Sequence, residues 1–318
     1  MRLLHRDNTK RLTLRYFNER EPIPPYAILS HRWSNDEVLF ADMERNGYTK
    51  KAGFQKIDFC AERAWQDGLQ YFWMDTCCID KWNPSERSRA INSMFRWYRN
   101  AAKCYVFLPD VAVDRETDEV RENAWEASFR SSEWFTRGWT LQELIAPKLV
   151  EFFSREGYRI GDKVSLGQLV HEITGVPIDA LEGRSLESFE NSDLIGWAKG
   201  RKTTEPEDGV YCLLGMLNVS MLVLYSEGPE QALSRLSDEM RPGNVTTHSI
   251  PFLQNPQFVG RESQLDWLEA RLFANILSEA DKQTAVLAIT GAGGTGKSQL
   301  ALELAYNMKG KYESCSVF

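Results

Sequence analysis

The chain has 318 residues, a length that predicts about two domains of roughly 100–200 residues each. Hydrophobic residues make up 42% and charged residues 26%, a globular balance that excludes a disordered tail, a collagen-like repeat and a coiled-coil rod. The formal net charge is −7, from 38 basic and 45 acidic residues. An acidic chain has no overall attraction for nucleic acid or anionic membrane, so we expect neither as a partner.

The sequence predicts a cytoplasmic protein without a membrane span. Its start, Met1–Asp7, lacks the apolar core of a signal peptide. The uncharged stretch Gly209–Ser226 is long enough to span a bilayer, but Gly215 and Asn218 interrupt it and acidic residues flank it, so we expect two buried elements instead. The six cysteines form no C-x-x-C pair and the four histidines have no ligand spacing, which predicts free thiols and no structural zinc.

Short apolar runs alternate with helical patterns in the first half of the chain. Helices are expected from Phe54 to the stop at Gly68, after the N-cap Asn83, and over 139–145. Strands are expected at 26–30, 69–75, 104–108 and 149–153. Strands separated by such helices need crossover connections, so the sequence predicts an α/β fold with a mostly parallel sheet covered on both faces.

The rest of the chain divides into an insertion, a helical extension, a linker and a second module. Residues 111–130 are polar and acidic and are expected to form an exposed insertion, whereas 160–240 contain more helix than strand. Turn-forming residues without periodicity indicate a linker over 241–257. Beyond it we expect a helix with Leu265, Leu268, Leu272 and Phe273 on one side, a strand at 285–290 and a helix at 299–308.

The strongest motif is the eight-residue pattern Gly-x-x-x-x-Gly-Lys-Ser at 291–298. Its backbone N–H groups can cradle phosphate oxygens, and the following helix directs its positive end at the same anion. The lysine would neutralise the β/γ-phosphates, and the serine would ligate Mg²⁺ of bound ATP or ADP. The alternative is an ordinary glycine-rich turn, which the preceding strand and following helix disfavour. The predicted nucleotide-binding residues are Gly291, Gly293, Gly294, Thr295, Gly296, Lys297 and Ser298, the last also as the metal ligand.

The residues around this loop, Phe-Val-Gly-Arg-Glu at 258–262 and Gln-Leu-Ala-Leu-Glu-Leu-Ala-Tyr at 299–306, resemble the NB-ARC module of signalling (STAND) ATPases. NACHT modules are similar, but the Val-Gly-Arg element favours NB-ARC. The resemblance implies that residues 258–318 hold the first βα unit of a P-loop NTPase. Because no acidic Walker B strand follows, it implies nucleotide binding with an incomplete ATPase, in a chain that is either a natural truncation or a fragment.

Polar clusters follow the expected strands of the first module at their carboxyl ends. They are Ser30–Trp33, Asp75–Thr76, Pro109–Asp110 and the start of the helix at 139–145. Ligand sites of open parallel sheets gather at this edge, so the sequence predicts a small-molecule pocket there. The alternatives are a solvated loop pair for His31 and Arg32, and a turn or cap residue for Asp75.

Four ordered motifs, at 26–33, 72–81, 137–147 and 197–215, resemble the heterokaryon-incompatibility (HET) domain of fungi, and the resemblance covers residues 1–240. A HET domain joined to NB-ARC resembles a fungal NOD-like receptor (NLR). That resemblance implies a part in non-self recognition, fungal innate immunity and programmed cell death, with self-association or other HET and NLR proteins as partners. The alternative is a non-catalytic HET module that signals by oligomerisation, and a third is a truncated regulator.

The HET fold is similar to the TIR domain, which implies a TIR-like, flavodoxin-like sheet with a helical C-terminal extension. Leu29–Arg32 matches the TIR Ser-x-Arg, and Trp139–Leu144 matches Trp-Cys-x-x-Glu-Leu except that threonine replaces cysteine. The resemblance implies that Glu143 supports cleavage of the nicotinamide–ribose bond of NAD by stabilising an oxocarbenium-like ribose. The alternatives are a helix-surface or capping acid for Glu143 and a core aromatic for Trp139. The implied substrate pocket comprises Ser30, His31, Arg32 as a phosphate contact, Trp33, Asp75 and Trp139 as a stacking wall.

Overall fold

The computed structural model describes residues 1–7, 11–18, 21–44, 48–113, 125–240, 255, 258–274, 289–290 and 296–311. They divide into two compact units, Met1–Asn218 with Val223–Leu233 and Val219–Leu222 with Ser234–Phe318. In the described ranges, no helix combines the length and apolarity needed to cross a bilayer. The five cysteines in these ranges are buried and unbridged, as the sequence predicts for them.

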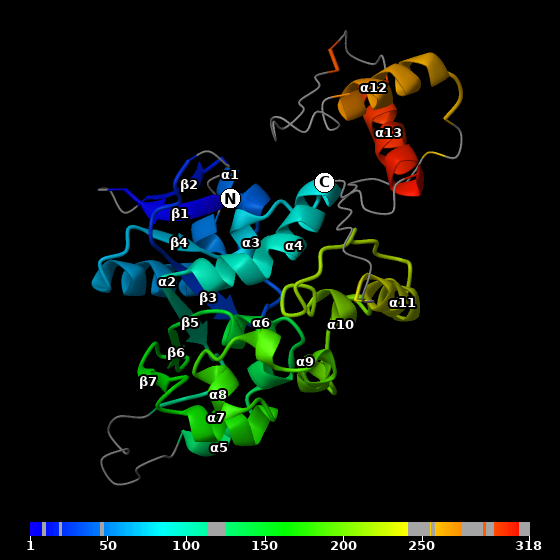
Figure 1. The fold of residues 1–318 in the computed structure, drawn as a ribbon. Coiled ribbons are helices and arrows are strands. Elements are labelled where there is room, and N and C mark those ends of the chain that lie inside the picture. Colours follow the sequence, from blue (N-terminus) through cyan, green and yellow to red (C-terminus); the bar gives the residue numbers. More distant parts are fainter. Residues whose placement is uncertain are drawn as a thin grey trace. The chain divides into compact units, whose positions relative to one another are not determined.

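The first unit is built on one seven-stranded mixed sheet (Figure 1). Its four central strands pair in parallel, β4–β3, β3–β5 and β5–β6, and they are the four strands that the sequence predicts. The α/β class is therefore confirmed. In spatial order the strands are β2 (Leu12–Tyr16), β1 (Arg2–Arg6), β4 (Tyr71–Trp73), β3 (Tyr26–His31), β5 (Lys103–Phe107), β6 (Val150–Phe153) and β7 (Arg159–Asp162).

Both edges of the sheet are antiparallel, which the sequence does not predict. β1 pairs with β2 and, through Leu4 opposite Phe72, with β4, and β7 pairs with β6. These strands carry charged residues, so their apolar runs are short. All six residues of β3 are buried, whereas the edge strands are only partly buried. Continuous apolar runs therefore reveal only the strands covered on both faces.

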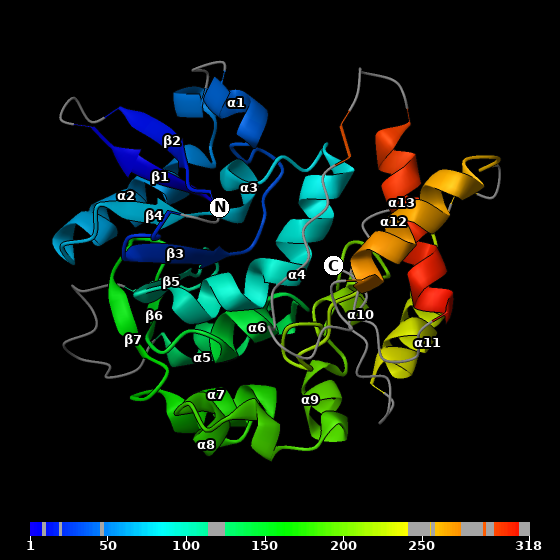
Figure 2. The ribbon, with the colours of Figure 1, turned by 45° about the horizontal axis from the view of Figure 1, so that its top comes forward.

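Helices cover the two faces of the sheet, as predicted (Figures 1 and 2). α2 (Phe54–Gln66) connects β3 to β4 and packs Phe59 against Phe107, with ring centroids 5.0 Å apart. α4 (Pro84–Asn100) connects β4 to β5 and packs Tyr98 against Trp73 on the opposite face. The two crossovers run in opposite directions along the sheet, so right-handed connections place their helices on opposite faces. The predicted N-cap is present, since Asn83 accepts a hydrogen bond from the Glu86 backbone N–H at 3.2 Å.

Three short helices lie between β5 and β6: α5 (Glu126–Arg130), η2 (Glu133–Thr136) and α6 (Thr140–Ile145). Phe129, Trp134 and Phe135 pack their rings on Phe152 of β6. The expectation of an exposed insertion over 111–130 is wrong at its ends, because Val111 and Phe129 are fully buried. Residues 114–124 lie outside the described residues.

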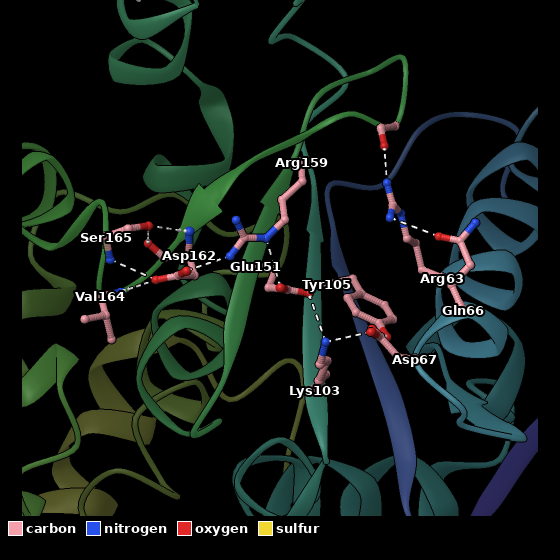
Figure 3. A network of polar contacts seen from close by, with 11 residues as sticks. Arg63, Gln66, Asp67, Lys103, Tyr105, Glu151, Arg159, Asp162, Val164 and Ser165 are labelled. Atoms are coloured by element: carbon pink, nitrogen blue, oxygen red, sulfur yellow. Dashed lines mark hydrogen bonds and ion pairs between the residues drawn. The ribbon is translucent and has the colours of Figure 1, made fainter.

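An ion-pair network joins the end of α2 to β5, β6 and β7 (Figure 3). Lys103 Nζ lies 2.7 Å from Asp67 Oδ1 and 3.6 Å from Glu151 Oε2. Arg159 continues the network from Glu151 Oε1, at 3.0 Å, to Asp162 Oδ2, at 2.6 Å. Exposed pairs each contribute little stability, but the repeated pairing favours one register for β7.

The helices that follow β7 confirm the helical extension that the sequence predicts after the sheet, and three further helices of this unit precede β5. Gly209–Ser226 contains a short helix, turns and irregular chain, with Leu214 and Met221 buried. The helices are α1 (Phe40–Glu44), η1 (Tyr48–Lys50), α3 (Asp75–Cys78), α7 (Gly167–Thr174), α8 (Ile178–Leu181), η3 (Leu186–Ser188), α9 (Asn191–Ala198), α10 (Asp208–Tyr211) and α11 (Pro229–Glu239), which continues into the second unit.

The second unit contains two further helices, α12 (Glu262–Ala274) and α13 (Lys297–Lys311). Leu265 and Leu268 of α12 pack against Leu300 and Leu304 of α13 in a small core, so the predicted apolar face of α12 is confirmed at these two positions. The linker, apart from Asn255, and the expected strand, apart from its last two residues, lie outside the described residues.

Candidate functional site

A cavity of about 260 Å³ lies in the first unit beyond the carboxyl ends of β3 and β4, beside α4 and α6. It lies next to the point where the chain order of the parallel strands reverses, between β3 and β5, where open α/β sheets bind ligands. Six of the predicted pocket and catalytic residues line it together: His31, Arg32, Trp33, Asp75, Trp139 and Glu143.

Ser30 lies behind this lining and orients Glu143. Trp134 Nε1 donates to Ser30 Oγ at 2.8 Å, and the Ser30 hydroxyl donates to Glu143 Oε2. An indole N–H can only donate, so it occupies an acceptor site of the serine and leaves the serine proton for the carboxyl group. The register of β3 with β5 turns Ser30 to the face that α6 covers. The chain Trp134–Ser30–Glu143 thus fixes the carboxyl group at the wall of the cavity.

Burial, together with the negative charge of Asp75, raises the pKa of Glu143 to about 8 against the opposing hydrogen bonds from Ser30 and Tyr98. The side chain is buried, with the residue only 8% exposed. At neutral pH the carboxyl group of Glu143 is therefore mostly protonated. The alternative reading of Glu143 as a surface acid is wrong.

Asp75 begins α3 and remains ionised in the same cavity. Burial opposes its ionisation, but Lys81, His31 and Trp33 together hold its pKa below the ordinary value. Trp33 Nε1 donates to Asp75 Oδ2 at 2.9 Å, and Lys81 Nζ lies 3.2 Å from the same oxygen. Lys81 Nζ also lies 3.0 Å from the centroid of the Trp33 ring, so a cation, a carboxylate and an aromatic ring form one contact group.

His31 and Arg32, at the end of β3, differ in their surroundings. Burial lowers the pKa of His31 to about 4, so its ring is neutral at pH 7, and its Nε2 lies 3.8 Å from Glu37 Oε2. Glu37 also forms a buried ion pair with Lys56, whose Nζ donates to the Arg32 carbonyl at 2.8 Å. Arg32 is partly exposed and forms an ion pair with Glu133.

A further carboxyl group, that of Asp208 in α10, also lines the cavity. Burial raises its pKa, while hydrogen bonds from Trp139 and Tyr225 oppose the shift. The Tyr225 hydroxyl lies 2.7 Å from Asp208 Oδ1, and the Arg87 guanidinium lies 3.7 Å from the centroid of the Tyr225 ring. The motif resemblance includes Asp208, but no local pattern predicts its place beside Glu143, since 65 residues and several turns separate the two.

The segment 201–204 holds the start of α6. The buried Arg201 guanidinium donates to the Arg137 carbonyl at 2.9 Å and to Thr140 Oγ1 at 3.2 Å. Arg137 Nη2 in turn donates to Thr204 Oγ1 at 3.0 Å. The fourth sequence motif therefore contacts the third, because residues 201–204 hydrogen-bond to Arg137 and Thr140 and so stabilise the helix that carries Glu143.

One predicted cluster is not part of the cavity. Asp110 accepts hydrogen bonds from Ser132 Oγ at 2.9 Å and from the Glu133 backbone N–H at 2.8 Å, so it caps the turn before η2. Thr76 is buried and does not line the cavity either. The sequence does not predict the roles of five lining residues, because those roles depend on tertiary contacts: Lys81, Arg87, Arg137, Asp208 and Tyr225.

The structure describes the last three residues of the phosphate-loop motif, Gly296, Lys297 and Ser298. Gly296 has φ +74°, a left-handed conformation that favours glycine, and Lys297 and Ser298 begin α13. Gly291, Gly293, Gly294 and Thr295 lie outside the described residues.

Residues 26–123 match the family model described as "Heterokaryon incompatibility protein (HET)". The chain is 50% identical over 242 residues to "Vegetative incompatibility protein HET-E-1" of Podospora anserina, an alignment that covers 76% of this chain and 18% of the relative. It is 39% identical over 79 residues to a "Nucleotide-binding leucine-rich repeat (NLR)-like protein" of Hyaloscypha variabilis, covering 25% of this chain and 8% of that relative. No solved structure matches. The chain thus spans less than a fifth of the length of either curated relative, and its match to the HET family model lies in its N-terminal part.

Proposed function

We propose that the HET domain is the effector of an NLR-type switch and hydrolyses the N-glycosidic bond of NAD. The supporting observation is the placement of Glu143: a buried carboxyl group, oriented by Ser30, at the wall of a cavity that also presents Trp33 and Trp139. Aromatic rings and one oriented carboxyl group suit a planar base joined to a ribose.

The protonation state of Glu143 agrees with a cationic substrate. The carboxyl group is mostly neutral in the free cavity because its pKa is about 8. The pyridinium ring of NAD carries a positive charge, and an opposite charge nearby favours the ionised form of a carboxyl group. Substrate binding would therefore release the Glu143 proton to solvent and leave a carboxylate beside the ribose, and the proton would return after the products leave.

The reaction balances with NAD and water as its only reactants. The bond between the ribose C1′ and the pyridinium nitrogen breaks, its electron pair passes to the nitrogen, and nicotinamide leaves as a neutral base. The Glu143 carboxylate stabilises the positive charge that develops on the ribose. Water then adds to C1′ and releases one proton, giving ADP-ribose.

We propose that the second unit binds ATP or ADP with Mg²⁺ through Gly291–Ser298. The described residues fit this role, since Gly296 has a conformation that favours glycine and α13 begins directly at Lys297. Lys297 would contact the β/γ-phosphates, and Ser298 would ligate the metal ion. The name of the Hyaloscypha relative also refers to nucleotide binding.

Together, these activities suit a cytoplasmic switch in heterokaryon incompatibility, in which nucleotide exchange permits self-association and clustered HET domains cause cell death. The name of the Podospora relative, a vegetative incompatibility protein, supports the incompatibility role. The second candidate is a HET module that only recruits other HET or NLR proteins. Trp65 and Trp82, which are 75% and 84% exposed, are available for such a protein contact.

The test measures nicotinamide release from NAD by the full chain, held as an oligomer by a fused oligomerisation tag. Glu143→Gln should lower the rate by at least about 100-fold, the range for losing one electrostatic stabiliser. Glu156→Gln is the matched control, because Glu156 lies outside the cavity and should leave the rate unchanged. Undiminished release by Glu143→Gln would remove the assigned role of Glu143. No release by the unaltered chain, with cell killing intact, would favour the recruiting module.

A further inference from the structure

We propose that Arg87 and Arg137 form the anion-binding subsite of the cavity and hold the phosphate groups of its substrate. This inference rests on the proposed function, because it identifies the substrate as a phosphorylated riboside. The resemblance to TIR domains implies Arg32 in this role, but the contacts in the structure favour the other two arginines.

The remaining cations of the cavity already have carboxylate partners. Arg32 is paired with Glu133. Lys81 lies 3.2 Å from Asp75 and over the ring of Trp33. A phosphate would have to compete with a carboxylate for either cation.

Arg87 lines the cavity without such a partner. Its guanidinium stacks on the Tyr225 ring at 3.7 Å, which fixes the plane of the group and leaves its edge for hydrogen bonds. Among the described residues no carboxylate lies within ion-pair distance of it. Asp208 lies close enough for the charge of Arg87 to lower its pKa, but burial outweighs this effect and raises that pKa, and the two side chains form no ion pair.

Arg137 lines the same cavity and is positioned by hydrogen bonds to Arg201 and Thr204. Its backbone carbonyl accepts from Arg201, and its Nη2 donates to Thr204 Oγ1 at 3.0 Å. In the described part of the chain it too has no carboxylate within ion-pair distance. Four further N–H donors of its guanidinium therefore remain for a ligand.

Two arginines without carboxylate partners beside one cavity suit phosphate oxygens. The guanidinium fork binds phosphate through paired, charge-assisted hydrogen bonds, and both residues are partly buried, so solvent screens them less than surface charges. A nucleoside without phosphate would leave both cations unneutralised. The expected substrates are therefore phosphate esters of the nicotinamide riboside, with the dinucleotide foremost.

The test measures binding of radiolabelled ADP-ribose by equilibrium dialysis. The parent is the full chain with Lys297→Ala, so that the phosphate loop does not contribute. Arg87→Gln and Arg137→Gln should each weaken binding by about 10-fold or more, the range for a hydrogen-bonded charge. Inorganic pyrophosphate should compete in the parent. Arg89→Gln is the matched control, since Arg89 is two residues from Arg87 on α4, is exposed and does not line the cavity.

Circular dichroism and thermal unfolding of each variant exclude loss of fold as the cause, and Arg87→Lys should bind with intermediate affinity. Equal ADP-ribose binding by the parent and both glutamine variants would overturn the subsite, as would an absence of binding by the parent. Nicotinamide release, measured separately, distinguishes the two proposals. Arginine-dependent binding without release would support the subsite and reject the glycohydrolase. Nicotinamide release together with ADP-ribose binding that does not depend on the two arginines would support the glycohydrolase and reject the subsite.

Discussion

Ser30 and Glu143 are 113 residues apart in the chain and form a buried hydrogen bond between the end of β3 and α6. The bond is part of a directed chain, because Trp134 Nε1 donates to Ser30 Oγ from the other side. It connects the first and third sequence motifs of the domain. Orientation of the candidate catalytic carboxyl group therefore depends on one hydroxyl group of the central strand.

We expect Ser30→Ala to weaken both the fold and the site. The substitution leaves the Trp134 N–H buried without an acceptor, which costs about 1–3 kcal/mol of unfolding free energy. It also removes a hydrogen bond that lowers the pKa of Glu143, so that pKa should rise further. Urea unfolding measures the first effect, and the pH profile of nicotinamide release measures the second.

Trp134→Phe is the companion variant for this prediction. It removes the donor to Ser30 but retains most of the ring packing against Phe135 and Phe152. The Ser30 proton remains available to Glu143, so the pH profile should move less than in Ser30→Ala. A larger shift in Trp134→Phe would contradict the proposed direction of the hydrogen-bond chain.

The sequence predicts the central part of the fold and the place of the site for physical reasons. Strands that are covered on both faces must be continuously apolar, and 26–30 and 104–108 show this directly. Parallel strands bring their carboxyl ends to one edge, so residues after β3 and β4 converge there. The antiparallel strand Arg2–Arg6, which lies between β2 and β4, lacks such a run and could not be recognised.

The rest of the site depends on tertiary contacts that no local pattern encodes. Arg87 belongs to an ordinary helical segment, and only the packing of the 222–228 segment places Tyr225 against it. Glu207 anchors that segment by accepting from the Ser226 and Gly228 backbone N–H groups at 2.8 and 3.1 Å. The raised pKa of Glu143 could not be predicted from the sequence either, because it results from the burial of the side chain.

Gly215→Ala should destabilise the first unit by about 3 kcal/mol, as expected for overpacking. A methyl group at this position would lie 2.0 Å from Phe95 Cβ and 2.7 Å from Phe95 Cγ, which forces α4 or the 212–218 turns to move. Gly209→Ala is the control, since its methyl group would enter open space within α10 and should add up to about 1 kcal/mol. Thermal unfolding of both variants measures the difference, and equal midpoints would contradict the close packing at Gly215.

Lys297→Ala should abolish ATP and ADP binding by the full chain while its fold remains. The lysine supplies the charge that neutralises the β/γ-phosphates, and alanine suits the first turn of α13. Equilibrium dialysis with labelled ATP measures binding, and circular dichroism checks the helix content. Lys311→Ala, at the other end of α13, is the matched control. Unchanged affinity in Lys297→Ala would reject the phosphate-loop assignment.

The stability of the chain should fall as pH rises from about 6.5 to about 8, and Glu143 should cause this slope. Its pKa is raised from 4.5 to about 8 by burial, so the folded chain retains a proton that the unfolded chain loses. Stability from this group is therefore complete below about pH 4.5 and decreases up to about pH 8, by at most about 1.4 kcal/mol per pH unit.

His31 has the opposite sign. Burial lowers its pKa from 6.5 to about 4, so the unfolded chain holds the extra proton in that window and stability rises with pH. The two slopes oppose each other between about pH 4.5 and 6.5, and that of Glu143 remains above pH 6.5. Urea unfolding followed by tryptophan fluorescence at pH 6.5, 7.25 and about 8 should therefore show a decline. Glu143→Gln cannot titrate and should remove this decline, whereas identical slopes in the two chains would show that Glu143 is already ionised at neutral pH.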